Sequence, residues 1–511
     1  MKFKDVSESR CAVEVEAGLV EGVLENGIWR FLGIPYAKPP LGELRWKPPQ
    51  PVPPWGGVRP CAQFGDSCPQ PESDQYGLGG LGEDCLHLNI WTPQESEGES
   101  LPVMVWIHGG AFLTGSSSVE LHRDETLYDG SDLARKGVIV VTINYRLGPF
   151  GFFAHPLLAG ESPRRISGNY GLLDQLAALT WVRRNISSFA GDDTKLTIFG
   201  QSAGASSICY LMVNPLAEGL FERAIIESAP FWIQGVDHPE YQSMQAAMEN
   251  GKALVRALGL EGSPRLMEEM RSRTYEEIID AAGMVVGLPI PGIHFGPAID
   301  GWLLPERPET LLASGEHHRV DVIAGSNRNE AVLMAPALAS DLDEYEEFVR
   351  RIAGPLAGEA LRRFPAASDE EVPGVLNRLI TALEFAAPAR FVARCASEAG
   401  GKAFLYNFAP DPGNEQRREV CACHGSEIPY IFGRLSPEGG YDSRDTDLSS
   451  LISAYWVNFS RGGDPNGSGL PRWPLYDKES DLSLELGYDI AAMSGLESEA
   501  CDLADRIHAV A

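Results

Sequence analysis

The sequence predicts an α/β protein with a mostly parallel central sheet, helices on both of its faces and large helical insertions. Two observations support this prediction: short apolar runs recur along the chain, and amphipathic segments separate them. An apolar run bounded by turn residues is typical of a strand that is buried on both faces. Strands that alternate with helices favour βαβ units, and these units build parallel sheets.

Six apolar runs are predicted as strands, at residues 101–107, 137–145, 195–199, 223–228, 319–326 and 402–408. Between the second and third runs, residues 171–189 place Leu172, Leu176 and Leu179 on one face of a helix. This pair of strands and its intervening helix therefore form the first predicted βαβ unit.

Two long segments, at about 236–318 and 331–400, contain helical patterns and are separated by the strand run at 319–326. We interpret them as helical insertions that cap one sheet, and we expect a single domain over residues 1–511. The proline-rich stretch at 47–60 is interpreted as a surface connection.

Composition excludes several classes of function. A formal net charge of -29 disfavours binding to nucleic acid or to an anionic membrane, because both would repel this surface. The chain has neither an apolar signal segment near its start nor a run of 18 apolar residues, so we expect a soluble, cytoplasmic protein.

The nine cysteines are scattered and do not suggest a disulfide framework or a metal site. We expect no metal and no cofactor, and the sequence leaves the oligomeric state open.

One short motif points to chemistry. Residues 200–204 read GQSAG, directly after the apolar run at 195–199, and place Ser202 between two glycines. This pattern fits a sharp strand-to-helix turn, where side chains other than hydrogen would collide. The motif alone does not distinguish a nucleophilic serine from a structural turn.

A serine nucleophile needs a histidine as base, a carboxylate that orients the histidine, and N–H donors for the developing oxyanion. The strand run at 101–107 ends in HGGAF, whose backbone N–H groups at Gly110 and Ala111 are candidate donors. Ala203, directly after the serine, is a third candidate. His108, in the same turn, is expected to bind the loop and not to act in catalysis.

Several segments resemble type-B carboxylesterases, the α/β-hydrolases that include para-nitrobenzyl esterases and cholinesterases. They are MVWIHGGAF, FAGDDTKLTIFGQSAGAS, GEDCLHLNIWTP, GIPYAKPPLGELRWKPP, NYRLGPFGFF and GNYGLLDQLAALTWVRRNI. The resemblance implies an acid after a later strand and a histidine further on, and Glu330 in GSNRNEAVL and His424 in ACHGSEIPYIFG occupy these places. It implies a Ser202–His424–Glu330 triad that hydrolyses a small-molecule carboxylic ester through an acyl-enzyme.

The resemblance also implies contacts outside the triad. Cys68 and Cys85 match a pair that is bridged in secreted relatives, so they are expected to lie close together, but to remain thiols in a reducing cytosol. Two structural ion pairs are implied as well, Arg45 with Glu83 and Arg146 with Asp174.

The substrate pocket is predicted to favour neutral, largely apolar esters. Gln201 stands where the family often has glutamate, and the loop before residue 82 has no tryptophan to hold a quaternary ammonium group. The aromatic candidates for the pocket are Phe112, Phe150, Phe231, Trp232 and Tyr76.

Two other functions remain open from the sequence. An amidase or carbamate hydrolase would use the same triad, with His424 as the acid that protonates a leaving amine. A non-catalytic binding module built on this fold is less favoured, because such relatives lack parts of the triad and this chain keeps them all.

Overall fold

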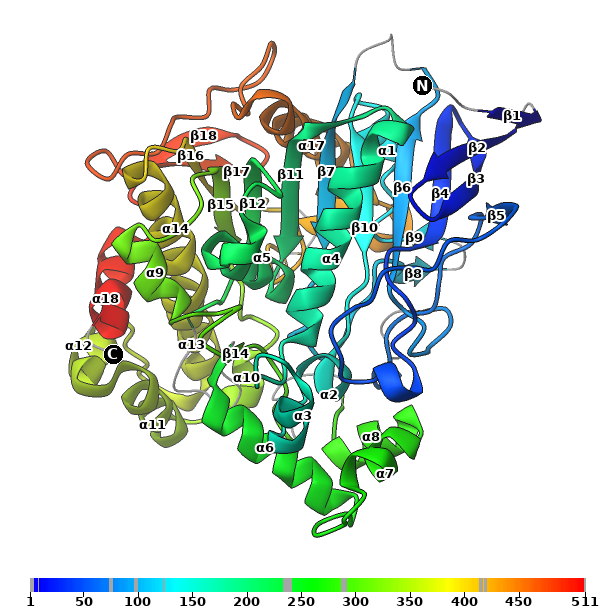
Figure 1. The fold of residues 1–511 in the computed structure, drawn as a ribbon. Helices are drawn as coiled ribbons and strands as arrows, with labels where there is room; N and C mark the ends of the chain where they lie inside the picture. The colour runs from blue at the N-terminus through cyan, green and yellow to red at the C-terminus, as the bar shows by residue number, and fades with distance from the viewer. Residues whose placement is uncertain are drawn as a thin grey trace.

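Parallel strands form the centre of one large sheet in the computed structural model (Figure 1). The structure describes residues 4–7, 9–72, 77–95, 100–122, 125–232, 241–285, 292–412, 417 and 421–509. In spatial order the parallel strands are β10 (Ile139–Ile143), β7 (Leu101–Ile107), β11 (Gly191–Gln201), β12 (Arg223–Glu227), β15 (Asp321–Asn327), β16 (Ala403–Phe408) and β17 (Leu482–Leu486). The first six of these strands in the chain are the six predicted runs.

Antiparallel strands extend this sheet at both edges, which the sequence pattern did not predict. They are β1 (Lys4–Ser7), β2 (Arg10–Val15), β3 (Gly18–Glu25), β4 (Ile28–Pro35) and β6 (His87–Pro93) on one side, and β18 (Ala491–Ser494) beyond β17 on the other. The proline-rich segment is a connection, as predicted, but its end forms β5 (Val58–Pro60) beside β3. Polar residues interrupt the antiparallel strands, as His87, Asn89 and Thr92 do in the almost wholly buried β6, so their apolar pattern was harder to detect.

Alternate side chains of the central strands enter two separate cores. Val103 and Val105 of β7 join a core with the helices α4 (Tyr170–Asn185), α5 (Ala203–Val213) and α14 (Ala387–Glu398). Met104 and Trp106 point to the opposite face and join a core with α1 (Ser131–Ala134), α16 (Ile428–Phe432) and α17 (Ser443–Gly462). Helices therefore cover both faces of the sheet, which explains why its central strands are apolar throughout.

The first insertion contains α6 (Met244–Ala257), α7 (Leu266–Ser272), α8 (Tyr275–Ala282) and α9 (Pro308–Ser314). It also contains a short parallel pair, β13 (Gln242–Ser243) and β14 (Ala298–Ile299), that the sequence did not reveal. Figure 1 shows α6, α7 and α8 beside α2 (Gly148–Phe152) and α3 (Pro156–Glu161), the segment that follows the carboxyl end of β10.

The second insertion contains α10 (Ala335–Leu338), α11 (Leu342–Ala353), α12 (Ala357–Arg363), α13 (Val372–Ile380) and a π-helix at Thr381–Ala386, which runs on into α14. It follows the carboxyl end of β15 directly. Residues of both insertions belong to the core that contains α4 and α5. That shared core favours one domain over residues 1–511, which stays a prediction.

Candidate active site

Ser202 lies at the turn between β11 and α5 in a strained backbone conformation, with φ 56° and ψ -126°. Its N–H donates to the carbonyl of Glu227 at the end of β12 (2.9 Å), and its carbonyl accepts from Ser206 in the first turn of α5 (2.8 Å). A non-glycine residue at positive φ is uncommon and is over-represented at functional sites. The turn therefore holds Ser202 at the carboxyl edge of the sheet, where its side chain is partly exposed.

The two motif glycines are required because β7 passes very close to this turn. A Cβ at position 204 would lie 2.0 Å from the carbonyl oxygen of Ile107, and one at position 200 would lie 2.6 Å from the same atom. Gly109 is constrained as well, since its Cβ would lie 2.7 Å from the carbonyl oxygen of Gln201 and 3.0 Å from the Cβ of Ser202. The HGGAF turn thus packs directly against the serine, as an oxyanion-binding loop must.

Glu330 and His424 come together although 94 residues separate them. The structure places Glu330 in the turn after β15 and His424 in the segment between β16 and α16. His424 Nδ1 lies 2.7 Å from Glu330 Oε2, and the carboxylate is fully buried. An ionised carboxylate can only accept, so Nδ1 carries the hydrogen in this bond and the lone pair is left on Nε2.

Gln201 brings this histidine to the serine turn. Its Nε2 lies 3.0 Å from His424 Nε2, and the amide N–H can donate to the ring lone pair. Because Gln201 is the residue directly before Ser202, the contact places the basic nitrogen of His424 beside the turn. The sequence marked Gln201 as a departure from the family but did not reveal this contact.

The HGGAF turn has an unusual backbone. Gly110, Ala111 and Phe112 all have positive φ, at 106°, 54° and 60°. Among the described residues, no acceptor is bonded to the N–H groups of Gly110, Ala111 or Ala203. These three predicted donors are therefore free to bind a ligand.

His108 supports this turn, as predicted. Its ring stacks on Tyr145 with a centroid distance of 4.5 Å, and its Nδ1 lies 2.8 Å from the carbonyl oxygen of Gly109. Burial lowers the pKa of His108 to about 4, so the ring is neutral at physiological pH.

The four predicted pocket aromatics that the structure describes are buried. Phe112, the last residue of the HGGAF turn, packs against Phe152 and Tyr210. The guanidinium carbon of Arg45 lies over the Phe150 ring, 5.8 Å from the centroid of that ring. Tyr76, the fifth candidate, lies outside the described residues.

Phe231 and Trp232 form a ring cluster with Phe391 of α14, and Trp232 also stacks on His508. The Nε1 of Trp232 donates to the carbonyl of Leu383 in the π-helix (3.2 Å). Trp232 therefore contacts the π-helix, and both rings pack against α14.

Phe385 is a ring at the site that sequence reasoning missed. It lies in the π-helix, and its centroid is 5.0 Å from that of His424. No local pattern distinguishes a π-helix from an α-helix in the sequence, although π-helices often occur at functional sites.

The pairings implied by family resemblance are present. Arg45 forms two hydrogen bonds with Glu83, and Arg146 binds Asp174 through two bonds of 2.7 Å in a fully buried pair.

Cys68 and Cys85 are joined by a disulfide, with their Cα atoms 5.1 Å apart. The expected proximity is therefore confirmed, and the structure shows the oxidised form; the expectation of thiols applied to a reducing cytosol. No helix among the described residues is long and apolar enough to cross a bilayer.

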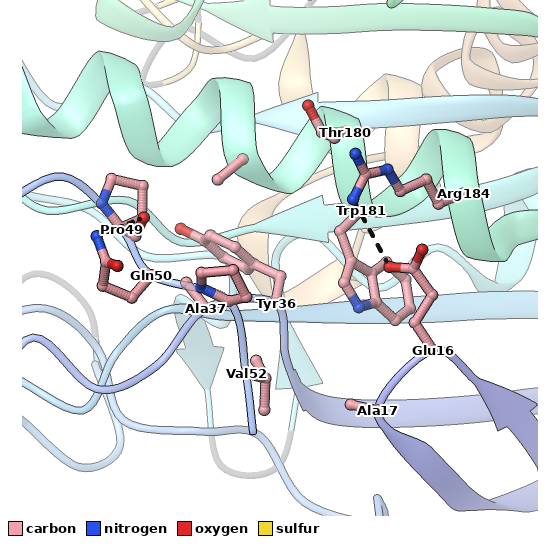
Figure 2. Close-up of a pocket in the computed structure, with 12 residues that line it drawn as sticks. Glu16, Ala17, Tyr36, Ala37, Pro49, Gln50, Val52, Thr180, Trp181 and Arg184 are labelled. Carbon is pink, nitrogen blue, oxygen red and sulfur yellow. Dashed lines mark hydrogen bonds and ion pairs between the residues drawn. The ribbon is translucent and has the colours of Figure 1, made fainter. Parts of the chain in front are cut away.

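A surface cavity of about 340 Å³ lies away from this site (Figure 2). Its walls include Trp181 and Arg184 near the end of α4, Glu16 in the turn after β2, and Tyr36. None of the predicted catalytic or pocket residues lines it. The end of α4 leads through the turn at Ile186–Phe189 into the start of β11, so this cavity lies near the amino end of β11, whereas Ser202 follows its carboxyl end.

Comparison with known proteins agrees with this geometry. The model of the carboxylesterase family matches residues 9–504. The chain is 36% identical to a fumonisin B1 esterase of Sphingopyxis macrogoltabida, over 95% of this chain and 88% of that protein. It is also 36% identical to a para-nitrobenzyl esterase of Bacillus subtilis (strain 168), over 95% and 97%.

A solved para-nitrobenzyl esterase structure superposes with a TM-score of 0.83 at 34% sequence identity, covering 96% of this chain and 99% of that one. The fold is thus the α/β-hydrolase fold, and the predicted reaction class, hydrolysis of carboxylic esters, is confirmed at the level of the family. The chain belongs to the carboxylesterase family.

Proposed function

We propose that the chain hydrolyses neutral, largely apolar esters by a two-step acyl transfer that uses Ser202, His424 and Glu330. The observation that carries this proposal is the chain of contacts from Glu330 through His424 to the serine turn. Glu330 Oε2 lies 2.7 Å from His424 Nδ1, and His424 Nε2 lies 3.0 Å from Gln201 Nε2. Oriented in this way, His424 has its acceptor nitrogen on the side of Ser202.

In the first step, the lone pair of His424 Nε2 turns from the Gln201 amide to the Ser202 hydroxyl and takes its proton while Oγ attacks the ester carbonyl. Glu330 stabilises the imidazolium that forms, and the N–H groups of Gly110, Ala111 and Ala203 bind the oxyanion. The imidazolium then protonates the departing alcohol, which leaves an acyl-enzyme. Water repeats the attack, with His424 again as the base, and releases the acid.

The preference for uncharged, apolar substrates rests on the surroundings of the site. Phe112 is the last residue of the HGGAF turn, the Phe385 ring lies 5.0 Å from that of His424, and the neutral amide of Gln201 adds no charge beside the serine. Glu384, next to Phe385, is buried without an ionic partner among the described residues, and burial raises its pKa to about 8. It is therefore mostly uncharged at neutral pH and offers little attraction for a cation.

A matched panel of para-nitrophenyl esters, para-nitroanilides, aryl carbamates and choline esters tests this function. We expect kcat/KM to be highest for para-nitrophenyl esters of short to medium acyl chains, because the leaving group needs little protonation and the pocket is apolar. Choline esters of the same acids should be slower by a factor of about 2 to 30, because a missing cation–π contact is worth about 0.5–2 kcal/mol.

Two outcomes would contradict this proposal. Faster turnover of anilides or carbamates than of esters would favour the amidase or carbamate hydrolase alternative. Efficient choline-ester turnover, or saturable inhibition by a choline analogue at micromolar concentration, would show that the pocket binds cations.

A further inference from the structure

Behind Glu330 lies a group of buried polar side chains that the proposed mechanism does not use. We call it the acid cluster: Glu227 at the end of β12, Asn327 at the end of β15, Tyr406 in β16, and Glu427 directly before α16. Each of these four side chains is at most 2% exposed. The inference that follows rests on the proposed roles of Ser202, His424 and Glu330.

Strand register brings the first members of the acid cluster together. Glu227, Gly325 and Tyr406 are paired positions across β12, β15 and β16. A Cβ at position 325 would lie 2.2 Å from the Tyr406 ring, so the ring lies over this glycine. Glu227 Oε1 accepts from the indole N–H of Trp456 in α17 at 2.8 Å.

Asn327 connects the acid cluster to both partners of Ser202. Its backbone N–H donates to Glu330 Oε1 at 2.6 Å. Its side-chain amide nitrogen donates to Glu427 Oε2 and, at 2.8 Å, to the carbonyl oxygen of Cys423, the residue before His424. One asparagine thus ties Glu330, the histidine segment and Glu427 into one network.

The acid cluster holds more acceptors than donors. Among the described residues, six buried side-chain oxygen atoms in or next to it have no hydrogen-bond partner: Glu227 Oε2, Ser228 Oγ, Ser326 Oγ, Asn327 Oδ1, Tyr406 Oη and Glu427 Oε1. Buried polar atoms of this kind are normally satisfied by ordered water or by a proton. No group of three or more metal-ligating side chains occurs in the described part of the chain. Protons and water are therefore the expected occupants.

Electrostatics agrees with protonated acids. Burial is the larger cause and the nearby Glu330 carboxylate the second cause that raises the pKa of Glu427 to about 7. Burial, as the larger cause, and the nearby Glu427 carboxylate raise the pKa of Glu227 well above its ordinary value. The titratable groups that face Glu427 are Glu227, Glu330, Tyr406, Cys423 and His424. Only His424 among them can supply a positive charge, so three adjacent carboxylates would repel one another.

We propose that Glu427 is a positioning residue for His424 and Glu330 that works by holding a proton. When its carboxyl group is protonated, Glu427 binds the Asn327 amide and Glu330 alone carries charge. When Glu427 is ionised, it places a second negative charge behind His424. The two titrations are then coupled, because a carboxylate at 427 favours the imidazolium form of His424. The fall of kcat/KM toward low pH, the acid limb of its pH profile, therefore extends over a wider pH range in the wild type than a single ionisation would give.

The Glu427→Gln variant tests this coupling. Glutamine keeps an acceptor for the Asn327 amide but cannot ionise, so we expect kcat/KM at pH 8 to remain within about threefold of wild type for a neutral para-nitrophenyl ester. The acid limb should narrow to one ionisation and move to lower pH, because removing a negative charge lowers the pKa of a nearby histidine. Asp447→Asn, an exposed change of the same charge on α17, should leave the limb in place.

A stability measurement tests the same proposal without using activity. The folded protein holds the Glu427 proton more tightly than the unfolded chain does, so the contribution of Glu427 to stability falls as pH rises from about 4.5 through about 7. Glu427→Gln removes this loss, and its Tm relative to wild type should be higher at pH 8 than at pH 5. Glu227→Gln should behave in the same direction.

The outcomes separate this proposal from the proposed triad. If the Glu427→Gln acid limb superposes on that of wild type and the Tm difference is the same at both pH values, Glu427 holds no titrating proton and the proposal is wrong. If the Tm difference changes with pH while Ser202→Ala retains full activity, the acid cluster stands and the triad assignment fails.

Discussion

The Ser202→Ala variant is expected to lose ester hydrolysis by a factor on the order of 10⁶ in kcat, as removal of a nucleophile does in serine hydrolases. The turn that holds Ser202 is built from backbone contacts: its N–H donates to the carbonyl of Glu227, and its carbonyl accepts from the N–H of Ser206. Alanine keeps these contacts, so the fold should be retained while the attacking oxygen is lost. Steady-state assays with a para-nitrophenyl ester, together with a circular dichroism spectrum, check this result.

Ser206→Ala is the matched control, because Ser206 lies one helical turn further along α5. Its hydroxyl is buried and has no hydrogen-bond partner among the described residues, so its removal should leave kcat unchanged. A Ser202→Ala enzyme that retains more than about a tenth of wild-type kcat would show that another group is the nucleophile.

The Glu330→Gln variant is expected to lower kcat by about 10⁴ while the protein remains folded. The reason is geometric: the N–H of Asn327 donates to Glu330 Oε1 at 2.6 Å and would hold the carbonyl oxygen of the new amide. The amide NH₂ would then face His424 Nδ1 and donate to it. The histidine would carry its hydrogen on Nε2 and could not accept the proton of Ser202.

Glu370→Gln, at an exposed carboxyl in the second insertion, controls for the change in net charge and should not alter kcat. Measured at pH 8, a loss of less than tenfold for Glu330→Gln would indicate that the carboxylate does not select the tautomer of His424, and another acid would have to be sought.

The central strands were predictable because local patterns encode them. A strand such as 101–107, buried on both faces, is apolar at every position, and Val103 and Trp106 indeed enter different cores. The antiparallel strands mix polar with apolar residues, even in β6, which is buried at all but its last position, and this weakens the same signal. The turn at Ser202 was predictable for a related reason, since its glycines are demanded by the carbonyl of Ile107 only 2.0 Å from a Cβ at position 204.

Glu330 and His424 were found only through family resemblance, because 94 residues separate them and no periodicity joins them. The contacts around them were not found at all. Asn327 meets Glu427 across 100 residues, and Phe385 reaches His424 because a π-helix precedes α14. Such contacts depend on tertiary packing, which a local pattern does not encode.

A chromogenic para-nitrophenyl alkylphosphonate tests the central claim most directly. Its phosphorus reacts with an activated serine, and the adduct places an oxygen where the N–H groups of Gly110, Ala111 and Ala203 would bind it. We expect release of one nitrophenolate per chain and, by peptide mass mapping, one label on Ser202, with Ser202→Ala unlabelled. A label on Ser116, Ser117, Ser118 or Ser228, or no label on an enzyme that still hydrolyses esters, would contradict the assignment of Ser202 as the nucleophile.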